Sequence, residues 1–136
     1  MNADEMKELV RHIMEDGFNQ QDMAVVYESF HPDYVRHGFG VDSMGSLAEH
    51  VDDLKARHAA FENAHFVINK ILAHDDTVAV MYTFKGIHRG PFKGLAPTGR
   101  EVTRTSAAFF TVRDGKVAEG TIIADSGGML AQLTGD

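Results

Sequence analysis

The stretch Gly115–Leu133, GKVAEGTIIADSGGMLAQL, has the pattern of a β-strand that ends at one acid, Asp125, and continues as a short helix over Ser126–Leu133. An acid at the end of an apolar strand is unusual. If such a carboxyl group is buried, burial raises its pKa toward the range useful for proton transfer. Asp125 is therefore the first candidate for acid/base chemistry. Capping of the helix that follows is an equally good structural interpretation, and both roles can hold together.

The sequence before this stretch predicts further antiparallel strands. Segments of period two, rich in Val, Ile, Phe and Tyr, form two hairpins around Asp75-Asp76 and Asp114-Gly115. The first hairpin pairs Ala64–His74 with Thr77–His88, and the second pairs Glu101–Val112 with Lys116–Ala124. The segment Arg89–Arg100 is rich in proline and glycine and joins the hairpins as a long loop.

The N-terminal half has helical spacing. It predicts helices over 4–20, 22–30 and about 45–61, with a short extended segment at 34–37. Helices segregated from a meander of strands indicate an α+β domain, in which N-terminal helices cover one face of a curved antiparallel sheet. Such a cup encloses a cavity, a common place for small ligands. The chain length fits a single domain, 1–136.

Composition excludes several function classes. The net charge of −7 argues against a nucleic-acid partner, and no apolar run approaches the ~20 residues that span a membrane. The chain has no cysteine and no signal-peptide pattern, so we expect a cytoplasmic protein without disulfides or thiol chemistry. It also has no zinc-binding spacing such as H-E-x-x-H and no glycine-rich nucleotide motif, so we expect neither a metal nor a cofactor.

The register of the second hairpin places Arg104 directly across from Asp125. Phe110 and Thr121 share that face, which we assign to the cavity unless a β-bulge shifts the pairing. Arg104 is a candidate for binding an anionic or enolate oxygen, because a guanidinium stabilises negative charge. A structural ion pair with Asp125 is the alternative.

The register of the first hairpin places Tyr82 and Phe84 on one face and Lys85 on the other. Because Lys85 is more easily placed outside, we assign Tyr82 and Phe84 to the cavity. The Tyr82 hydroxyl is then able to bond a carbonyl or a negatively charged oxygen. A core tyrosine with a satisfied hydroxyl is the structural alternative.

Histidines supply the remaining candidates. His37 and His88 end extended segments beside glycine-containing loops, and either is able to exchange a proton near neutral pH. His50 belongs to the third helix, which covers the cavity and is able to present it inward. Tyr34, in the same extended segment as His37, is included among the ligand-binding candidates. For each histidine, an ordinary packed or surface position is the alternative.

Three motifs point to a known family. Gly86–Gly99 matches G-x-H-x-G-x-F-x-G-x-x-P-T-G, Leu130–Leu133 matches L-x-Q-L, and Tyr34–His37 matches Y-V-x-H. With the aspartate after the last strand, Asp125, the chain resembles the SnoaL-like polyketide cyclases of the nuclear transport factor 2-like superfamily. That superfamily also contains ketosteroid isomerase and limonene epoxide hydrolase. The resemblance covers nearly the whole chain.

The resemblance implies a cone-shaped α+β barrel that forms a homodimer through the outer face of its sheet. It also implies that Asp125 acts as general acid/base in an intramolecular aldol closure, without metal or cofactor. Departures from the pattern modify this expectation. Relatives often have tryptophan where this chain has Thr121, and phenylalanine where it has Arg104. We therefore expect a roomier cavity of different charge, with His37 or His88 as the histidine partner of Asp125.

These observations lead to one hypothesis and two alternatives. The leading hypothesis is a cofactor-independent acid/base enzyme that acts on a hydrophobic, carbonyl-bearing small molecule, either cyclase-like or isomerase-like. The alternatives are a binding protein of the same fold that does not turn its ligand over, and an epoxide hydrolase-like activity. Fold alone does not choose among them.

Overall fold

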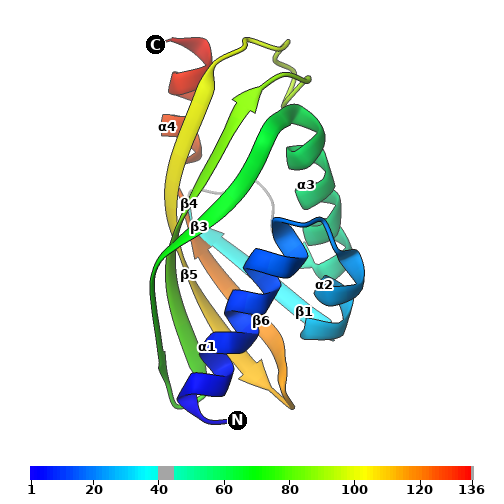
Figure 1. Ribbon diagram of the computed structural model, residues 1–136, viewed down its shortest axis with the longest axis vertical. Helices are drawn as coiled ribbons and strands as arrows, with labels where there is room; N and C mark the ends of the chain where they lie inside the picture. Colours follow the sequence, from blue (N-terminus) through cyan, green and yellow to red (C-terminus); the bar gives the residue numbers. More distant parts are fainter. Residues whose placement is uncertain (40–44, 136) are drawn as a thin grey trace.

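The computed structural model describes residues 1–39 and 45–135, and it confirms the α+β architecture (Figure 1). The helical elements are α1 Ala3–His12, the π-helical turn η1 Ile13–Phe18, α2 Met23–Ser29, α3 Leu47–Ala60 and α4 Ser126–Thr134. The strands are β1 Phe30–Phe39, β2 Gly45–Ser46, β3 Phe61–His74, β4 Thr77–His88, β5 Glu101–Arg113 and β6 Lys116–Ile123. None of the helices in the described residues has the length and apolarity that crossing a membrane requires.

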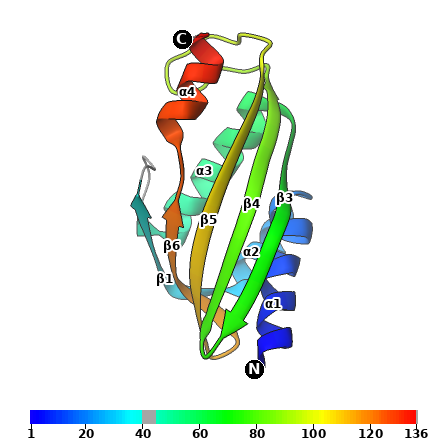
Figure 2. The same cartoon turned by 90° about the vertical axis from the view of Figure 1, so that its left-hand side faces the viewer.

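The six strands form one sheet in the order β2-β1-β6-β5-β4-β3. Strands β1 and β6 pair in parallel, and all other neighbours pair antiparallel. The sheet is strongly curved, and α1, α2 and α3 lie on one side of it (Figures 1 and 2). The main hydrophobic core fills the space between these helices and the sheet.

The helix predicted over 4–20 consists of α1 and the wider turn η1. α1 begins at a capping box in which Asn2 and Glu5 exchange hydrogen bonds. α3 begins at a second capping box, formed by Ser46 and Glu49. Ser43, which the helical spacing also allows as a cap, lies outside the described residues. The predicted starts of the helices were therefore right to within a turn.

The β5–β6 hairpin has a register that the sequence did not reveal. Arg113 pairs with Lys116 as predicted, but β6 carries one extra residue, Ala118, before Glu119 pairs with Thr111. Every later residue of β6 is therefore shifted by one, which exchanges the two faces of the strand. The predicted register beyond this bulge is wrong.

The bulge corrects three predicted positions. Thr121 was expected in the cavity, but it pairs with Phe109 and lies on the outer face of the sheet. Ile122, which the unshifted register would place on the outer face, pairs with Ala108 and is buried. Strand β6 ends at Ile123, so Asp125 has no partner across β5.

The β3–β4 hairpin also contains a bulge, but its consequence is smaller. Ile71 pairs with Val80 as predicted, and a shift at Asn69 then pairs Ile68 with Tyr82. The bulge lies in β3, so the faces of β4 keep their predicted assignment. Tyr82 is buried on the inner face.

Two amide side chains hold helices onto the sheet. Asn19, which follows η1, donates to the carbonyl oxygen of Phe66 at 2.9 Å and accepts from its N–H at 2.7 Å. Gln132 of α4 makes the same pair of bonds with Thr103 of β5, each 2.8 Å long. Beyond the end of β6, the Gln132 amide thus satisfies backbone groups that a neighbouring strand would otherwise bind.

Candidate active site

A pocket of about 760 Å³, counting space open to solvent, lies between the helices and the inner face of the sheet. Its apolar wall consists of Met14, Phe18, Leu54, Phe66, Phe110 and Ile122. Its polar side chains are Arg36, His50, Asp53, Arg57, Tyr82, Lys93 and Arg104. This combination of an apolar wall with a few polar groups is typical of small-molecule sites.

The η1 turn places two residues of the apolar wall. The π-helical hydrogen bond from the Asn19 N–H to the Met14 carbonyl, 3.0 Å, widens the helix at this point. Met14 and Phe18 both line the pocket, and the Phe18 ring lies 5.7 Å from that of Phe66. The end of the first helix and the start of β3 therefore close one side of the pocket.

Helix α3 supplies three of the seven polar side chains, more than any other element. His50, Asp53 and Arg57 follow one another at intervals of three and four residues, which places them on one face of the helix. Leu54 lies on the same face and adds to the apolar wall. α3 therefore brings the Asp53 carboxylate, the His50 imidazole and the Arg57 guanidinium into one pocket.

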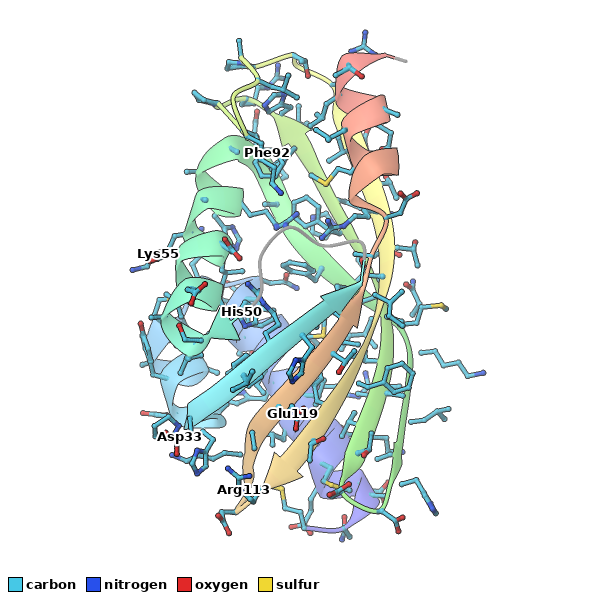
Figure 3. The ribbon with its side chains drawn as sticks, turned by 180° about the vertical axis from the view of Figure 1, so that it is seen from behind. Asp33, His50, Lys55, Phe92, Arg113 and Glu119 are labelled. Atoms are coloured by element: carbon cyan, nitrogen blue, oxygen red, sulfur yellow. The ribbon has the colours of Figure 1, made fainter. Side chains whose placement is uncertain are left out.

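His50 is held among aromatic rings, between α3 and β1 (Figure 3). Its ring lies 5.4 Å from that of Phe18 and stacks on Tyr34 at 5.9 Å. Burial lowers the pKa of His50 to about 3, and the nearby Arg36 charge acts in the same direction. His50 is therefore neutral at physiological pH. Its Nδ1 atom is buried and has no hydrogen-bond partner within the described part of the chain.

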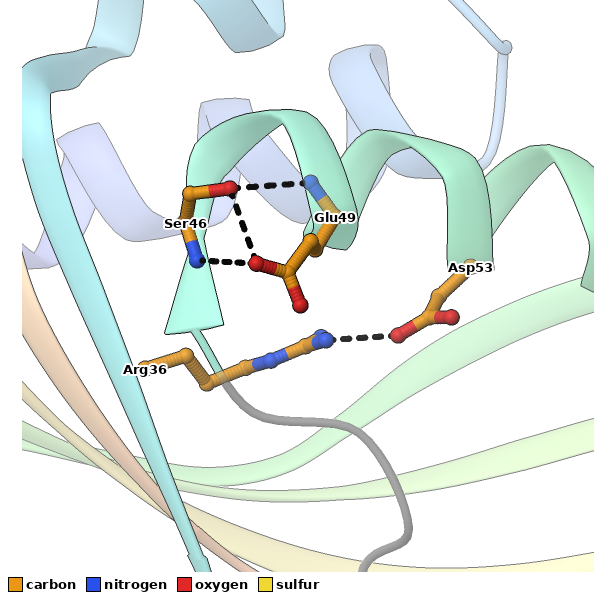
Figure 4. Close-up of polar contacts among 4 residues, drawn as sticks. All are labelled: Arg36, Ser46, Glu49 and Asp53. Carbon is orange, nitrogen blue, oxygen red and sulfur yellow. Dashed lines mark hydrogen bonds and ion pairs between the residues drawn. The ribbon is translucent and has the colours of Figure 1, made fainter.

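Arg36 and Asp53 form an ion pair across the pocket, with 2.6 Å between Nη2 and Oδ2 (Figure 4). Arg36 is buried, whereas the Asp53 side chain is 37% exposed. The pair links β1 to α3 next to the capping box that begins α3. It places a carboxylate at the rim of the pocket, within reach of a bound molecule.

Arg57 is in a different environment. Its guanidinium lies over the Phe84 ring, 5.0 Å from the centroid, and 5.9 Å from that of Phe92. Its Nη1 atom lies 3.9 Å from the Met129 sulfur. Burial lowers the pKa of Arg57 to about 10, and the charge of Arg104 contributes, so Arg57 stays charged at neutral pH.

Arg104 and Lys93 also line the pocket. Burial lowers the pKa of both side chains, and the Arg104 charge adds to the effect on Lys93. Burial raises the pKa of Tyr82, so its hydroxyl remains protonated and able to donate a hydrogen bond. These side chains surround the pocket with positive charge and one neutral donor.

Asp125 lies elsewhere than expected. Its side chain is exposed and accepts a hydrogen bond of 2.7 Å from the Gly128 N–H, as the N-cap of α4. It is not among the side chains that line the pocket, and no ion pair joins it to Arg104 among the described residues. Its charge still opposes the lowering of the Arg104 pKa. The expected place of Asp125 in the cavity wall is wrong.

Two further candidates lie outside the pocket. His37 is on the outer face of β1, where its Nε2 atom lies 2.9 Å from Glu119 Oε1. Alternation along β1 explains this position, because Arg36 faces inward and its neighbour must face outward. Thr121 occupies the same outer face, as described above. Neither residue is positioned to touch a molecule in the pocket.

Three predicted ligand-binding residues are buried behind the pocket wall. His88 accepts from the Thr98 N–H through Nδ1 at 3.2 Å, which anchors the loop after β4. The Phe84 ring packs against the Arg57 guanidinium, as described above. Tyr34 packs against His50, and its hydroxyl is buried without a hydrogen-bond partner in the described chain. By contrast, His50, Tyr82, Arg104 and Phe110 line the pocket directly.

Sequence reasoning missed Arg36, Asp53, Arg57 and Lys93. The sequence does contain a pattern that could have identified Arg36, Asp53 and Arg57. Tyr34 and Arg36 alternate with His37 along β1, and Asp53 and Arg57 lie three and seven residues after His50, on the same helical face. Lys93 lies in the long loop, where no periodicity predicts the direction of a side chain. No three His, Asp or Glu side chains of the described residues converge as a metal site.

The sequence profile of the SnoaL-like polyketide cyclase family matches residues 8–133. The chain belongs to this family. No curated protein matches the chain.

Solved structures of SnoaL-like proteins have the same fold. AclR from Streptomyces galilaeus, described as a candidate hydroxylase, is 26% identical with a TM-score of 0.87, over 99% of this chain and 84% of AclR. IdmH from Streptomyces antibioticus, described as a candidate polyketide cyclase, is 28% identical with a TM-score of 0.81, over 93% and 96% of the two chains. A Catenulispora acidiphila protein with a ketosteroid isomerase-like fold, solved with trimethylamine, is 15% identical with a TM-score of 0.76, over 93% and 92%.

Proposed function

We propose that this SnoaL-like protein is a cofactor-independent acid/base enzyme that acts on a hydrophobic, carbonyl-bearing small molecule, in the manner of a polyketide cyclase. One observation carries the proposal: Asp53, His50 and Tyr82 line a single pocket with an aromatic wall. A carboxylate is able to remove a proton next to a carbonyl, and fixed donors are able to stabilise the enolate that forms.

The pocket suggests roles for Asp53, Tyr82 and Arg104. The Asp53 carboxylate takes the proton from the carbon next to the carbonyl. The electron pair of that C–H bond forms the carbon–carbon double bond of the enolate, and the carbonyl π pair moves to the oxygen. Tyr82 donates a hydrogen bond to this oxygen, and Arg104 balances its negative charge. In an aldol closure, the enolate carbon then bonds to a second carbonyl carbon. The new alkoxide recovers the proton from Asp53.

The protein's ability to form an enolate is testable without its natural substrate. 2-Tetralone is a hydrophobic bicyclic ketone whose α-protons exchange with D₂O only after enolisation, which NMR follows directly. We expect the protein to accelerate this exchange and Asp53→Asn to reduce the acceleration about 100-fold. The matched control is Asp125→Asn, which keeps the helix cap and is expected to retain the exchange.

Two results would contradict the assignment of the base. If Asp53→Asn exchanges protons as fast as the native protein, Asp53 is not the base. If Asp125→Asn alone abolishes the exchange, the base is the exposed helix cap. Circular dichroism of both variants separates loss of activity from loss of fold.

A binding protein without catalysis is the second candidate. The 2.6 Å ion pair with Arg36 favours it, since this bond engages the Asp53 carboxylate before any ligand arrives. In that case ligands bind in the pocket, but native protein and Asp53→Asn give the same α-proton exchange as buffer.

We also propose that the protein forms a homodimer through the outer face of its sheet. Support comes from apolar side chains that lie exposed on that face: Val35, Val67, Leu72, Met81, Phe109 and Ile123. Exposed apolar groups gathered on one face often mark a contact surface.

A further inference from the structure

We infer that the ligand of this pocket carries a carboxylate group, and that Arg57 is the residue that binds it. The inference rests on the proposed function in one respect, since it takes the pocket to hold a small molecule. It then narrows the class of ligand from a hydrophobic carbonyl compound to a hydrophobic carbonyl compound that is also an acid.

The contacts of Arg57 are the first line of argument. Its guanidinium faces the rings of Phe84 and Phe92 and the sulfur of Met129. No carboxylate of the described residues lies within 4.0 Å of its nitrogen atoms. A guanidinium has five N–H donors, and ring faces with one thioether satisfy few of them. Arg57 therefore lines the pocket without a carboxylate partner among the described residues.

The charge around Arg57 is the second line. Arg36, Arg57, Lys93 and Arg104 all line the pocket, whereas Asp53 is the one acid among its described lining residues. Asp53 already pairs with Arg36. Basic side chains thus outnumber acidic ones among the described residues that line the pocket, in a chain whose net charge is −7. A concave site lined by one sign of charge draws in ligands of the opposite sign.

The surroundings of Arg57 suit a planar carboxylate. Two phenylalanine rings lie beside the flat guanidinium, which leaves its edge to meet a planar group. A carboxylate matches this edge with two parallel hydrogen bonds. The apolar wall formed by Phe18, Phe66 and Phe110 is suited to the hydrophobic body of the same molecule.

The spacing along α3 orients the ligand. Arg57 lies four residues after Asp53 and seven after His50, which is about 6 Å and 10 Å along a helix axis. Figure 3 shows Phe92, a neighbour of Arg57, toward one end of α3 and His50 toward the other. The acid end of the ligand therefore lies away from the reacting carbon, beside the loop after β4.

A matched pair of probes tests the inference on the full-length chain. 2-Naphthoate carries a carboxylate, and 2-acetonaphthone replaces one carboxylate oxygen with a methyl group at nearly the same shape. Isothermal titration calorimetry measures both. We expect 2-naphthoate to bind about 10- to 100-fold more tightly, as charge-assisted hydrogen bonds allow.

Variants of Arg57 test whether this residue causes the preference for 2-naphthoate over 2-acetonaphthone. Arg57→Met keeps a flexible, unbranched side chain without the charge, and it should abolish the preference for 2-naphthoate. Arg57→Lys keeps the charge without the flat fork, and it should retain only part of the preference. The control is Arg113→Met, since Arg113 is exposed at the far end of the molecule (Figure 3) and should leave the preference intact.

The inference fails if the two probes bind equally, if neither binds, or if Arg57→Met keeps the preference. Should Arg57→Met not fold, raising the salt concentration on native protein replaces it, because only 2-naphthoate binding should weaken. The outcomes for the two proposals are distinct. Exchange of 2-tetralone without a preference for 2-naphthoate supports the enzyme and refutes the acid ligand. The reverse result supports an acid-binding protein and refutes the enzyme.

Discussion

The His50 imidazole is surrounded by the rings of Phe18, Phe30 and Tyr34, with centroid distances of 5.4, 5.6 and 5.9 Å. Such an enclosure excludes water, so the neutral form of the ring is strongly favoured. In the pocket, a neutral imidazole is able to donate or accept a hydrogen bond without adding to the positive charge already present.

The stability of the protein should depend on pH through His50. Its pKa is about 3 in the folded protein and 6.5 when unfolded, so the unfolded chain binds more protons between these values. Stability should therefore fall as the pH drops from 6.5 toward 3, by up to about 1.4 kcal/mol per pH unit. Urea unfolding between pH 4 and 8 measures this slope.

His50→Gln should remove the part of the pH dependence of the unfolding free energy that His50 causes. The control is His74→Gln, because the His74 side chain is 91% exposed and its replacement should leave the slope as it is. An unchanged slope in His50→Gln would show that other groups cause the acid sensitivity.

Single residues also show where sequence reasoning reached its limit. His37 was chosen for its chemistry, although alternation with Arg36 along one strand decides which of the two faces inward. Asp125 was chosen for its place at a strand end, and the same place makes it a helix cap. Tyr82 and Phe110 were found because their strands keep a regular period. The residue type identifies candidates for a site, but the local backbone conformation determines which of their side chains face the pocket.

The extra residue Ala118 in β6 decides which side chains of that strand reach the pocket. Without the bulge, Thr121 would face the pocket. Because of the bulge, Gly120 and Ile122 face inward and Thr121 faces outward. Helices and strands were predictable because their periods extend over many residues. A bulge is a local irregularity that leaves almost no trace in the hydrophobic pattern, so the register could not be predicted past it.

Gly120 is needed where the bulge places it. A Cβ atom at this position would lie 2.6 Å from the Tyr34 hydroxyl oxygen and 3.0 Å from the Phe110 ring. We therefore expect Gly120→Ala to destabilise the protein by about 1–3 kcal/mol in urea unfolding, as overpacking of a core does. Adding Tyr34→Phe should recover part of this loss, since it removes the oxygen that the new methyl group meets.

Two comparisons test this explanation. Tyr34→Phe alone should cost little, because the hydroxyl it removes has no hydrogen-bond partner in the described chain. Gly127→Ala should be tolerated, as its Cβ would meet only Asp125 Oδ1, at 3.8 Å. If Gly120→Ala is as stable as native protein, strand β6 is able to move away from β1.

The molecule as a whole has two contrasting faces. The helices cover the inner side of the sheet, while the outer side is left open (Figure 2). The layered arrangement was predictable because it follows from the order of helices and strands along the chain. The composition of the outer face was only partly predictable, since it depends on the shifted register of β6.

The proposed homodimer should depend on Phe109, near the middle of β5 on the outer face. Phe109→Glu would place charges between the two sheets, so we expect the dimer to dissociate at micromolar concentration in analytical ultracentrifugation. Tyr27→Glu is the control, because Tyr27 is similarly exposed but lies on α2. A native protein that sediments as a monomer would refute the proposal.

The Gln132 amide, which bonds both backbone groups of Thr103, bears on how the protein behaves at high concentration. Past the end of β6, β5 would otherwise present open hydrogen-bonding groups to any extended peptide, and such open strand segments are where sheets join into aggregates. α4 covers this segment with a side chain that cannot propagate a sheet. We therefore expect α4 to limit edge-to-edge association of sheets at this end of the molecule.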